Sequence, residues 1–348
     1  MDSVTIAGVD CGTNSIRLMI AEVDAHGLHV VTPRILRIIR LGEGVDKNRR
    51  FSDDALQRAY AAVREFAEVL SRQHVDSLRF VATSATRDAA NRNEFEDAVE
   101  SILGVRPEVI PGSEEAALSF LGATATLHSK QNQSQNQSQT PPQAHMRDHA
   151  PYLVVDLGGG STELVVGGDG DAVPEYQVRA GFSMNVGSVR MTERHLLADP
   201  PTEAQIEEAT ADIDEHIDEA FTRIPAQDVS TIIGVSGTVT TMSAIAMGCQ
   251  SYDRHAVDGA RITFDDVLKA DDRVLRMSRK ERGTVGAIHP GRIDVVGGGA
   301  LIWTRVLTRV ASAAATQGRH IDSFLASEHG LLDGIVLDRG RKMLADNI

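Results

Sequence analysis

The sequence is poor in aromatic residues and has no long apolar run. Phe, Trp and Tyr together make up 4% of its 348 residues, although hydrophobic residues as a whole make up 42% and suffice for aliphatic cores. No apolar run approaches the roughly 18 residues that a membrane-spanning helix needs. The first ten residues also lack the basic and apolar regions of a secretory signal. We therefore expect a globular protein that binds no membrane.

Cysteine and positive charge are also scarce. Two cysteines, Cys11 and Cys249, argue against a disulfide framework and fit the reducing cytoplasm. The 35 lysines and arginines are outnumbered by 49 aspartates and glutamates, which gives a formal net charge of -14. Proteins that coat nucleic acids bind mainly through basic residues, so we expect no nucleic-acid partner. A polyanionic substrate can still bind where a local basic groove or a metal ion offsets the overall charge.

A polar segment divides the chain into two parts. The length suits two domains of about 150 residues each. Residues 129–143, SKQNQSQNQSQTPPQ, cannot bury enough apolar area to offset their ordering entropy. We expect a first domain at 1–128, a disordered linker at 129–149, a second domain at 150–326, and a last helix at 327–348 that packs back on the first domain.

The two parts resemble each other. In each, short strands precede a helix and then strands and helices alternate, a pattern typical of a mixed sheet flanked by helices. Three pairs of segments also match in the same order, which indicates a duplicated α/β fold. The pairs are residues 9–18 with 155–164, 81–86 with 233–238, and 113–118 with 327–332.

Two glycine-rich turns carry the first chemical signal. Each follows a strand and begins with an aspartate, Asp10 or Asp156. Glycines let backbone N–H groups approach a phosphate closely, and an aspartate at the strand end can hold Mg²⁺. A single turn of this kind is explained by a tight hairpin, but two matched turns in one chain favour phosphate binding. The predicted phosphate-binding residues are Thr13, Asn14, Ser15, Arg17, Gly158, Gly159, Gly160, Ser161, Thr162, Ser236, Gly237 and Thr238.

Seven ordered motifs resemble those of a known family. They are GVDCGTNSIRLMI, ATSATRDAANRNEF, VIPGSEEAAL, VVDLGGGSTELVV, GSVRMTERHL, GVSGTVTT and HPGRIDVVGGGALI. They resemble the motifs of the exopolyphosphatase/guanosine pentaphosphatase (Ppx/GppA) family, from residue 4 to about residue 335. The resemblance implies two actin-like, ribonuclease H-like domains with a cleft between them. It is closest to short members without the C-terminal HD-type domain, and it implies a cytoplasmic homodimer.

The resemblance also implies catalytic roles. Glu115 matches the catalytic base, and a carboxylate beside a phosphate can deprotonate the attacking water. Without the resemblance, Glu115 reads as an ordinary acidic residue in the first turn of a helix. Arg87 and Arg292 match arginines that point into the cleft, where they would clamp the substrate and stabilise charge on the transferred phosphoryl group. Arg190 is typical of the family, but we assign it no role.

A divalent metal site is implied as well. Asp156 and Glu163 match acidic residues tied to Mg²⁺ or another divalent cation, and we add Asp10 as the equivalent aspartate of the first turn. Arg17 occupies the place of Glu163 in the first half. This difference suggests that one half holds metal and the other holds phosphate.

One spacing suggests a different chemistry. Cys11 and Arg17 have the Cys-x5-Arg spacing of cysteine phosphatases, in which an activated thiolate attacks phosphorus. Asp10 would raise the pKa of that thiol, and the matched turn has Leu157 in the same place. We therefore interpret Cys11 as an apolar packing residue.

Three functions follow from these residues. The first is release of terminal phosphate from inorganic polyphosphate, with short chains favoured, or from guanosine pentaphosphate. The second is an actin-fold kinase for a small metabolite. The third is a non-catalytic sensor of the alarmone, which the presence of Glu115, Asp156 and Glu163 disfavours.

Overall fold

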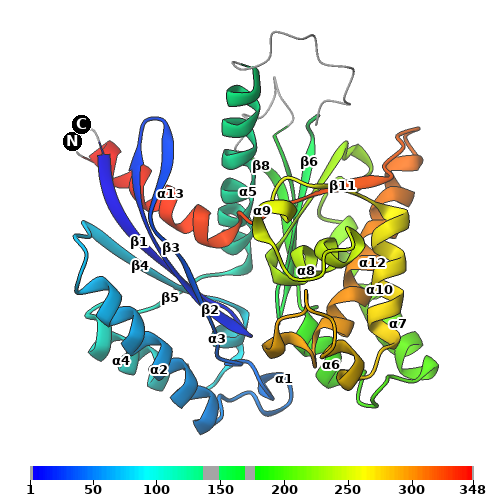
Figure 1. The fold of residues 1–348 in the computed structure, drawn as a ribbon, viewed down its shortest axis with the longest axis horizontal. Coiled ribbons are helices and arrows are strands. Elements are labelled where there is room, and N and C mark those ends of the chain that lie inside the picture. Colours follow the sequence, from blue (N-terminus) through cyan, green and yellow to red (C-terminus); the bar gives the residue numbers. More distant parts are fainter. Residues whose placement is uncertain (1–2, 136–148, 169–176, 347–348) are drawn as a thin grey trace.

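The computed structural model describes residues 3–135, 149–168 and 177–346, which form two α/β domains side by side (Figure 1). The first domain has a five-stranded sheet in the order β3-β2-β1-β4-β5. Its strands are β1 (Ser3–Cys11), β2 (Ser15–Asp24), β3 (Gly27–Ile38), β4 (Ser77–Ala82) and β5 (Glu108–Val109).

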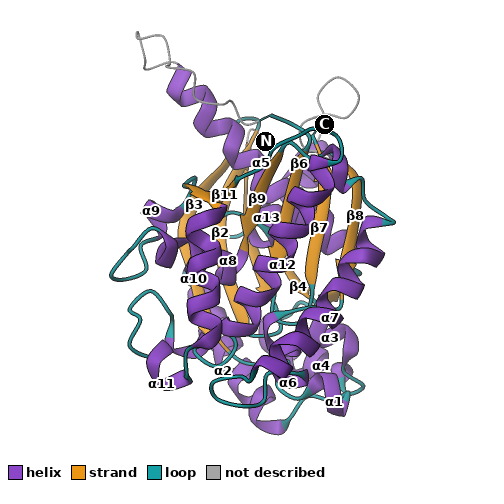
Figure 2. Cartoon of the chain, turned by 90° about the vertical axis from the view of Figure 1, so that its right-hand side faces the viewer, coloured by secondary structure: helices purple, strands orange, loops and turns teal. Residues whose placement is uncertain are grey.

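The second domain has a six-stranded sheet in the order β10-β11-β9-β6-β7-β8. Figure 2 shows the helices of this domain in front of its strands. Its strands are β6 (Tyr152–Leu157), β7 (Thr162–Gly167), β8 (Val178–Met184), β9 (Thr231–Val235), β10 (Arg261–Thr263) and β11 (Ser323–Ala326).

The two sheets follow one plan, down to the register of individual pairs. In both, the first three strands are antiparallel, and two later strands run parallel to the first: β4 and β5 in the first sheet, β9 and β11 in the second. The second sheet adds β10, which pairs antiparallel with β11 at its edge. Asp10 pairs with Arg17 in the first sheet, and Asp156 pairs with Glu163 at the equivalent position in the second. The prediction of two duplicated, actin-like α/β domains is therefore confirmed.

Helices surround both sheets and bury aliphatic cores against them. In the second domain, Trp303 is fully buried and packs edge-to-face on Phe324. No helix among the described ranges is both long and apolar enough to cross a membrane. Apart from α5 and α13, which are described below, the helices are α1 (Val45–Asn48), α2 (Asp53–Leu70), α3 (Ser84–Asp88), α4 (Arg92–Leu103), α6 (Ser188–Arg194), α7 (Glu203–Phe221), α8 (Ser236–Ala246), α9 (Arg254–Val257), α10 (Phe264–Arg276), α11 (Arg279–Arg282) and α12 (Val296–Ala315). Two 3-10 turns lie at Ala226–Asp228 and Pro290–Arg292.

Two helices exchange partners between the domains. Helix α5 (Gly112–Gln135) follows the first domain in sequence but packs on β6, β7 and β8 of the second sheet. The last helix, α13 (Leu331–Asp346), packs on β1 and β2 of the first. The first sheet's own segment thus ends before α5, earlier than the expected boundary at 128. Residues 129–135, expected in the linker, continue α5, while 136–148 lie outside the described residues.

Helices α5 and α13 also pack on each other, at glycines. A Cβ atom on Gly122 of α5 would lie 2.0 Å from the carbonyl oxygen of Gly330. A Cβ atom on Gly334 of α13 would lie 1.8 Å from the carbonyl oxygen of Leu118. Because no larger residue fits at these distances, glycine brings the two backbones together where the domains join.

Candidate active site

The two glycine-rich turns have the same geometry. In the first, the N–H of Gly12 donates to the carbonyl of Ser15 over 2.9 Å, and in the second the N–H of Gly158 donates to that of Ser161 over 2.9 Å. Each bond closes a tight turn between the first two strands of its sheet. The sequence match between the halves is therefore a match of backbone conformation at the strand ends.

The turns face each other across the domain junction. A Cβ atom on Gly160 would lie 2.6 Å from the hydroxyl oxygens of both Thr13 and Ser84. A Cβ atom on Gly159 would lie 3.0 Å from Thr13. The absence of side chains at these glycines lets the turns of the two domains come together around one site.

A small cavity of about 50 Å³ lies between the turns, and we call it the phosphate cavity. It brings together residues from both halves, from the first turn of α5 and from the loop before α12. The residues predicted for the site that line it are Asp10, Thr13, Asn14, Ser15, Arg17, Glu115, Asp156, Gly158, Gly159, Gly160, Ser161, Ser236, Thr238 and Arg292.

Four predicted site residues do not line this cavity. Thr162 is fully buried and donates its hydroxyl to the carbonyl of Val186 over 2.6 Å, so it stabilises the turn instead of facing a phosphate. Glu163 is also buried, and its carboxylate accepts hydrogen bonds from Ser183 and Ser161. The other two, Arg87 and Gly237, support residues of the cavity.

Arg87 lies against Glu115. Its Nη1 donates to Glu115 Oε2 over 2.8 Å and to the carbonyl of Ile110 over 2.9 Å. Burial raises the pKa of Glu115 to about 7, while Arg87 acts in the opposite direction and Asp156 adds to the increase. The arrangement gives a carboxylate that gains and loses a proton near neutral pH, which is the property that a general base needs.

The other carboxylates of the site are buried close to Glu115. Burial raises the pKa of Asp10, opposed by Arg17, whose Nη1 lies 3.4 Å from Asp10 Oδ2. Burial also raises the pKa of Asp156, and it raises that of Glu163 well above its usual range, with Glu115 adding to the effect. Four carboxyl groups, those of Asp10, Glu115, Asp156 and Glu163, are therefore buried close together with few cations beside them.

Such a site suits a divalent cation held in part by the substrate. Within the described residues, no three or more His, Cys, Asp or Glu side chains are grouped so that they could hold an ion by themselves. Magnesium, however, is commonly bound by one or two carboxylates together with substrate phosphates and water. Asp10 and Asp156 line the cavity and fit that arrangement, whereas Glu163 lies behind it.

Gly237 makes room for Arg292. A Cβ atom on Gly237 would lie 2.2 Å from the guanidinium of Arg292, so the cation rests directly on this backbone. Burial, and then the nearby Arg17, lower the pKa of Arg292 to about 10. Arg292 remains a cation at neutral pH, and no hydrogen bond or ion pair joins its guanidinium to another described residue. It is therefore available to bind an anion.

A larger cavity of about 580 Å³ opens from the phosphate cavity, and we call it the arginine pocket. The two cavities share Arg17, Asp156, Ser236, Arg292 and Leu331. Sequence reasoning missed this pocket, because its walls come from distant segments. Its charged lining residues are Arg17, Arg34, Asp156, Arg254, Arg292, Glu328 and Asp333.

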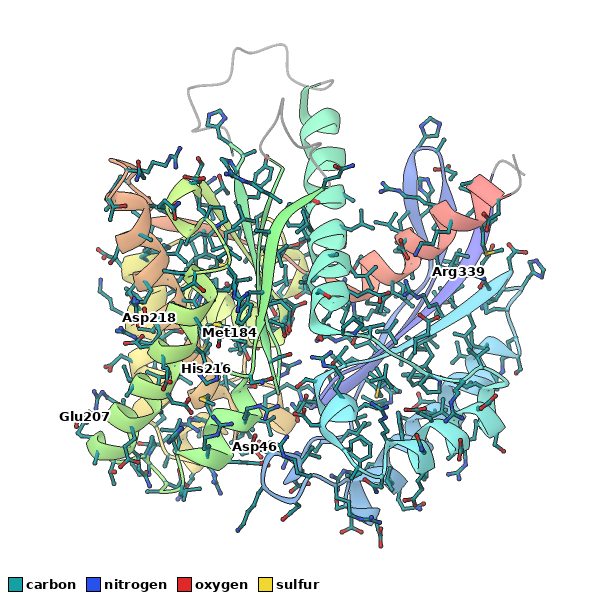
Figure 3. The ribbon with its side chains drawn as sticks, turned by 180° about the vertical axis from the view of Figure 1, so that it is seen from behind. Asp46, Met184, Glu207, His216, Asp218 and Arg339 are labelled. Carbon is teal, nitrogen blue, oxygen red and sulfur yellow. The ribbon has the colours of Figure 1, made fainter. Side chains whose placement is uncertain are left out.

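Ser119 escaped sequence reasoning, and Arg190 was assigned no role by it. Ser119 donates a hydrogen bond to Asp156 Oδ2. It lies four residues after Glu115 on α5 and hence on the same helix face, a spacing that could have revealed it. Arg190 of α6 joins the domains, because its guanidinium contacts Asp46 and Asp88 of the first. Asp46 lies beside the second domain in Figure 3.

Cys11 has no nucleophilic role in this geometry. It is 1% exposed and belongs to the core of the first domain, and burial and Asp10 raise its pKa. A thiol in these surroundings stays protonated and inert. The cysteine-phosphatase spacing is therefore incidental.

Comparison with known proteins places this site in a family. A model of the Ppx/GppA phosphatase family matches residues 19–134 and 143–339. Exopolyphosphatase 2 of Mycobacterium tuberculosis is 39% identical over 344 residues, which cover 95% of this chain and 97% of that protein. The crystal structure of an exopolyphosphatase-like protein is 64% identical and superposes with a TM-score of 0.91, covering 99% of this chain and 100% of the other.

A more distant structure supports the same assignment. The Aquifex aeolicus Ppx/GppA family member is 26% identical, has a TM-score of 0.74, and covers 99% of both chains. The family match extends over both domains and includes the second glycine-rich turn, Glu115 and Arg292. The chain therefore belongs to the Ppx/GppA phosphatase family.

Proposed function

We propose that this protein is an exopolyphosphatase that releases terminal orthophosphate from inorganic polyphosphate. The observation that carries the proposal is Glu115, a buried carboxylate with a pKa raised to about 7, on the wall of a cavity between the two glycine-rich turns. The names of the relatives, exopolyphosphatase 2 and an exopolyphosphatase-like protein, point to the same substrate.

The terminal phosphoryl group would bind between the two turns. The backbone N–H groups of Gly159 and Gly160 and the hydroxyls of Thr13 and Ser161 offer hydrogen bonds to its oxygens. Arg17 and Arg292 offer positive charge. These donors come from both domains, so they converge only when the turns face each other as they do here. Charge that builds up on the phosphoryl oxygens during transfer is stabilised by the same groups.

Glu115 would activate the water. Its carboxylate accepts a proton as the water oxygen forms a bond to phosphorus, and the bond from phosphorus to the bridging oxygen breaks. The shortened chain leaves with the electron pair of that bond, as a phosphate anion. Arg87 holds Glu115 in place and keeps part of it ionised at neutral pH.

Asp10 and Asp156 would hold a magnesium ion together with the substrate. When bound, such an ion neutralises charge on the phosphoryl oxygens. Ser119 fixes Asp156 through its hydrogen bond, and Arg17 fixes Asp10.

The test is a panel of substrates with Mg²⁺. We expect orthophosphate release from tripolyphosphate and from long-chain polyphosphate, measured with the purified protein. Guanosine pentaphosphate and ATP should be compared under the same conditions. Phosphate release from guanosine pentaphosphate alone would contradict the proposed substrate, and transfer of the γ-phosphate of ATP to an acceptor would indicate the kinase instead.

A further inference from the structure

The chain behind the terminal phosphate has two ways out of the phosphate cavity. One is a groove of about 420 Å³ that shares Thr13 and Asn14 with it. An ion pair between the domains lines this groove, with Arg40 Nη1 2.9 Å from Asp294 Oδ2. The other way out is the arginine pocket, where Arg17 and Arg292 continue from one cavity to the next. A polyanion therefore extends more favourably into the arginine pocket.

Two arginines of this pocket each have an N–H donor without a partner. The Nε atoms of Arg17 and Arg34 are buried without hydrogen-bond partners. Arg34 comes from β3 of the first domain and reaches the loop after β11 in the second. Its side chain is 14% exposed, so an anion that reached it would be largely shielded from water. These donors suit the phosphoryl units next to the terminal one.

A carboxylate stands among these cations. Glu328, in the loop after β11, is only 10% exposed at its side chain. Its Oε2 lies 3.4 Å from Arg34 Nη1 and 3.9 Å from Arg254 Nε, and its Oε1 accepts a hydrogen bond from Tyr252. A carboxylate in a pocket for polyanions has a cost, because it repels every additional phosphoryl unit.

The cations beside Glu328 are shared with other carboxylates. Burial lowers the pKa of His329, but hydrogen bonds with Asp258 and Asp333 outweigh that effect and raise it to about 9, so His329 is charged at neutral pH. Arg34 contacts both Glu328 and Asp333. Glu328 is thus one of several carboxylates around Arg34 and His329, and its other contact, Arg254, is 42% exposed.

We propose that Glu328 is a specificity-determining residue that limits how many phosphoryl units the arginine pocket accepts. The inference rests on the proposed polyphosphate substrate. A short chain engages Arg17 and Arg292 near the phosphate cavity, whereas a longer one must pass the carboxylate of Glu328. Charge repulsion at this depth is weakly screened by salt, so it selects for short chains.

The experiment compares KM for tripolyphosphate and for long-chain polyphosphate in the wild type and in Glu328→Gln. The variant keeps the shape of the side chain and removes its charge. We expect the KM for the long chain, relative to that for tripolyphosphate, to fall by about fivefold or more. If Glu328 only held Arg34 in position, the substitution would loosen Arg34 and raise the KM for both substrates.

The matched control is Glu114→Gln. Glu114 occupies the place of Glu328 in the duplicated motif, but it pairs with Arg79 over 2.7 Å and lines neither cavity. Glu114→Gln changes the net charge of the protein by the same amount as Glu328→Gln, and it should leave the KM ratio at its wild-type value. If Glu328→Gln failed to fold, Glu328→Ala would serve, since Arg34 also contacts the backbone carbonyl of residue 328.

The outcomes separate this inference from the proposed function. If the wild type released no phosphate from either chain, the polyphosphate substrate itself would be wrong. If the wild type were active but Glu328→Gln left the ratio unchanged, raised both KM values, or matched Glu114→Gln, Glu328 would not determine chain length.

Discussion

Arg87 and Glu115 form an ion pair in which Arg87 Nη1 donates to Glu115 Oε2 over 2.8 Å. The pair joins α3 to the first turn of α5, so it also ties the first sheet's segment to the helix that packs on the second. Arg87 opposes the pKa increase that burial causes in Glu115. Arg87 therefore increases the share of Glu115, the proposed base, that is ionised at a given pH.

The first prediction concerns the base itself. Glu115→Gln keeps the shape of the side chain but cannot accept a proton, so phosphate release should fall by about 10²–10⁴-fold. Substrate affinity should persist, since the change removes a negative charge near phosphate. Glu114→Gln is the neighbouring control and should stay close to the wild type. An inactive Glu114→Gln beside an active Glu115→Gln would move the base by one residue.

The pH dependence should show the same group. Because the pKa of Glu115 is about 7 and its ionised form is the base, kcat/KM should fall as pH decreases below about 7. Arg87→Gln removes a charge that lowers this pKa, so the acid limb should move to higher pH. Arg292→Gln should slow the reaction without moving the limb. An acid limb that stayed in place in Arg87→Gln would show that Glu115 is not the titrating group.

Arg292 should contribute through its contact with the substrate. Its removal in Arg292→Ala eliminates a charge-assisted contact with phosphate, for which about 1.5–3 kcal/mol is typical. The folded structure should survive, because the guanidinium of Arg292 makes no ion pair or hydrogen bond with another residue in the described part of the chain, and the substitution keeps its backbone hydrogen bonds to His289 and Val295. Steady-state kinetics and a thermal melt measure both effects. Wild-type kinetics would place Arg292 outside the substrate contacts.

Cys11 should be dispensable for chemistry. Cys11→Ser should retain most activity, since the matched turn has Leu157 there and the thiol is buried and protonated. Phosphate-release assays of the variant, with circular dichroism to verify folding, measure this. Complete loss of activity in a well-folded variant would restore the thiol as a nucleophile.

The contact between α5 and α13 should limit stability. In Gly334→Ala, the new Cβ atom would lie 1.8 Å from the carbonyl oxygen of Leu118, so the helices must move apart. Overpacking of this kind costs about 1–3 kcal/mol. Gly181→Ala is the control, because its Cβ atom would come no closer than 3.5 Å to its neighbours. Equal melting temperatures for the two variants would contradict the prediction.

Local sequence patterns predicted the two turns and their equivalence. A glycine-rich turn depends on a few consecutive residues, so the match of residues 9–18 with 155–164 carried over directly into strand register and hydrogen bonding. The placement of Thr162 in the site was less successful. Its hydroxyl turns toward Val186 because the strand alternates faces at the point where the turn ends.

Contacts between distant segments could not be predicted in the same way. Arg34 and Glu328 lie 294 residues apart in sequence, and no spacing rule relates them. No local pattern indicated that α5 would pack on the second sheet. Arg87 was expected to face the substrate, because an arginine in a motif carries no sign of whether its partner is a phosphate or the carboxylate of Glu115.

The exchange of helices has a consequence for how the chain is made. The buried face of β1 and β2 that includes Val4, Ile6 and Met19 is covered by Leu332 and Val336 of α13. During synthesis, the ribosome releases the first sheet long before residues 331–346 exist. One apolar face of the N-terminal domain therefore stays uncovered until translation is nearly complete. The second domain differs, because its covering helix α5 is synthesised before its strands.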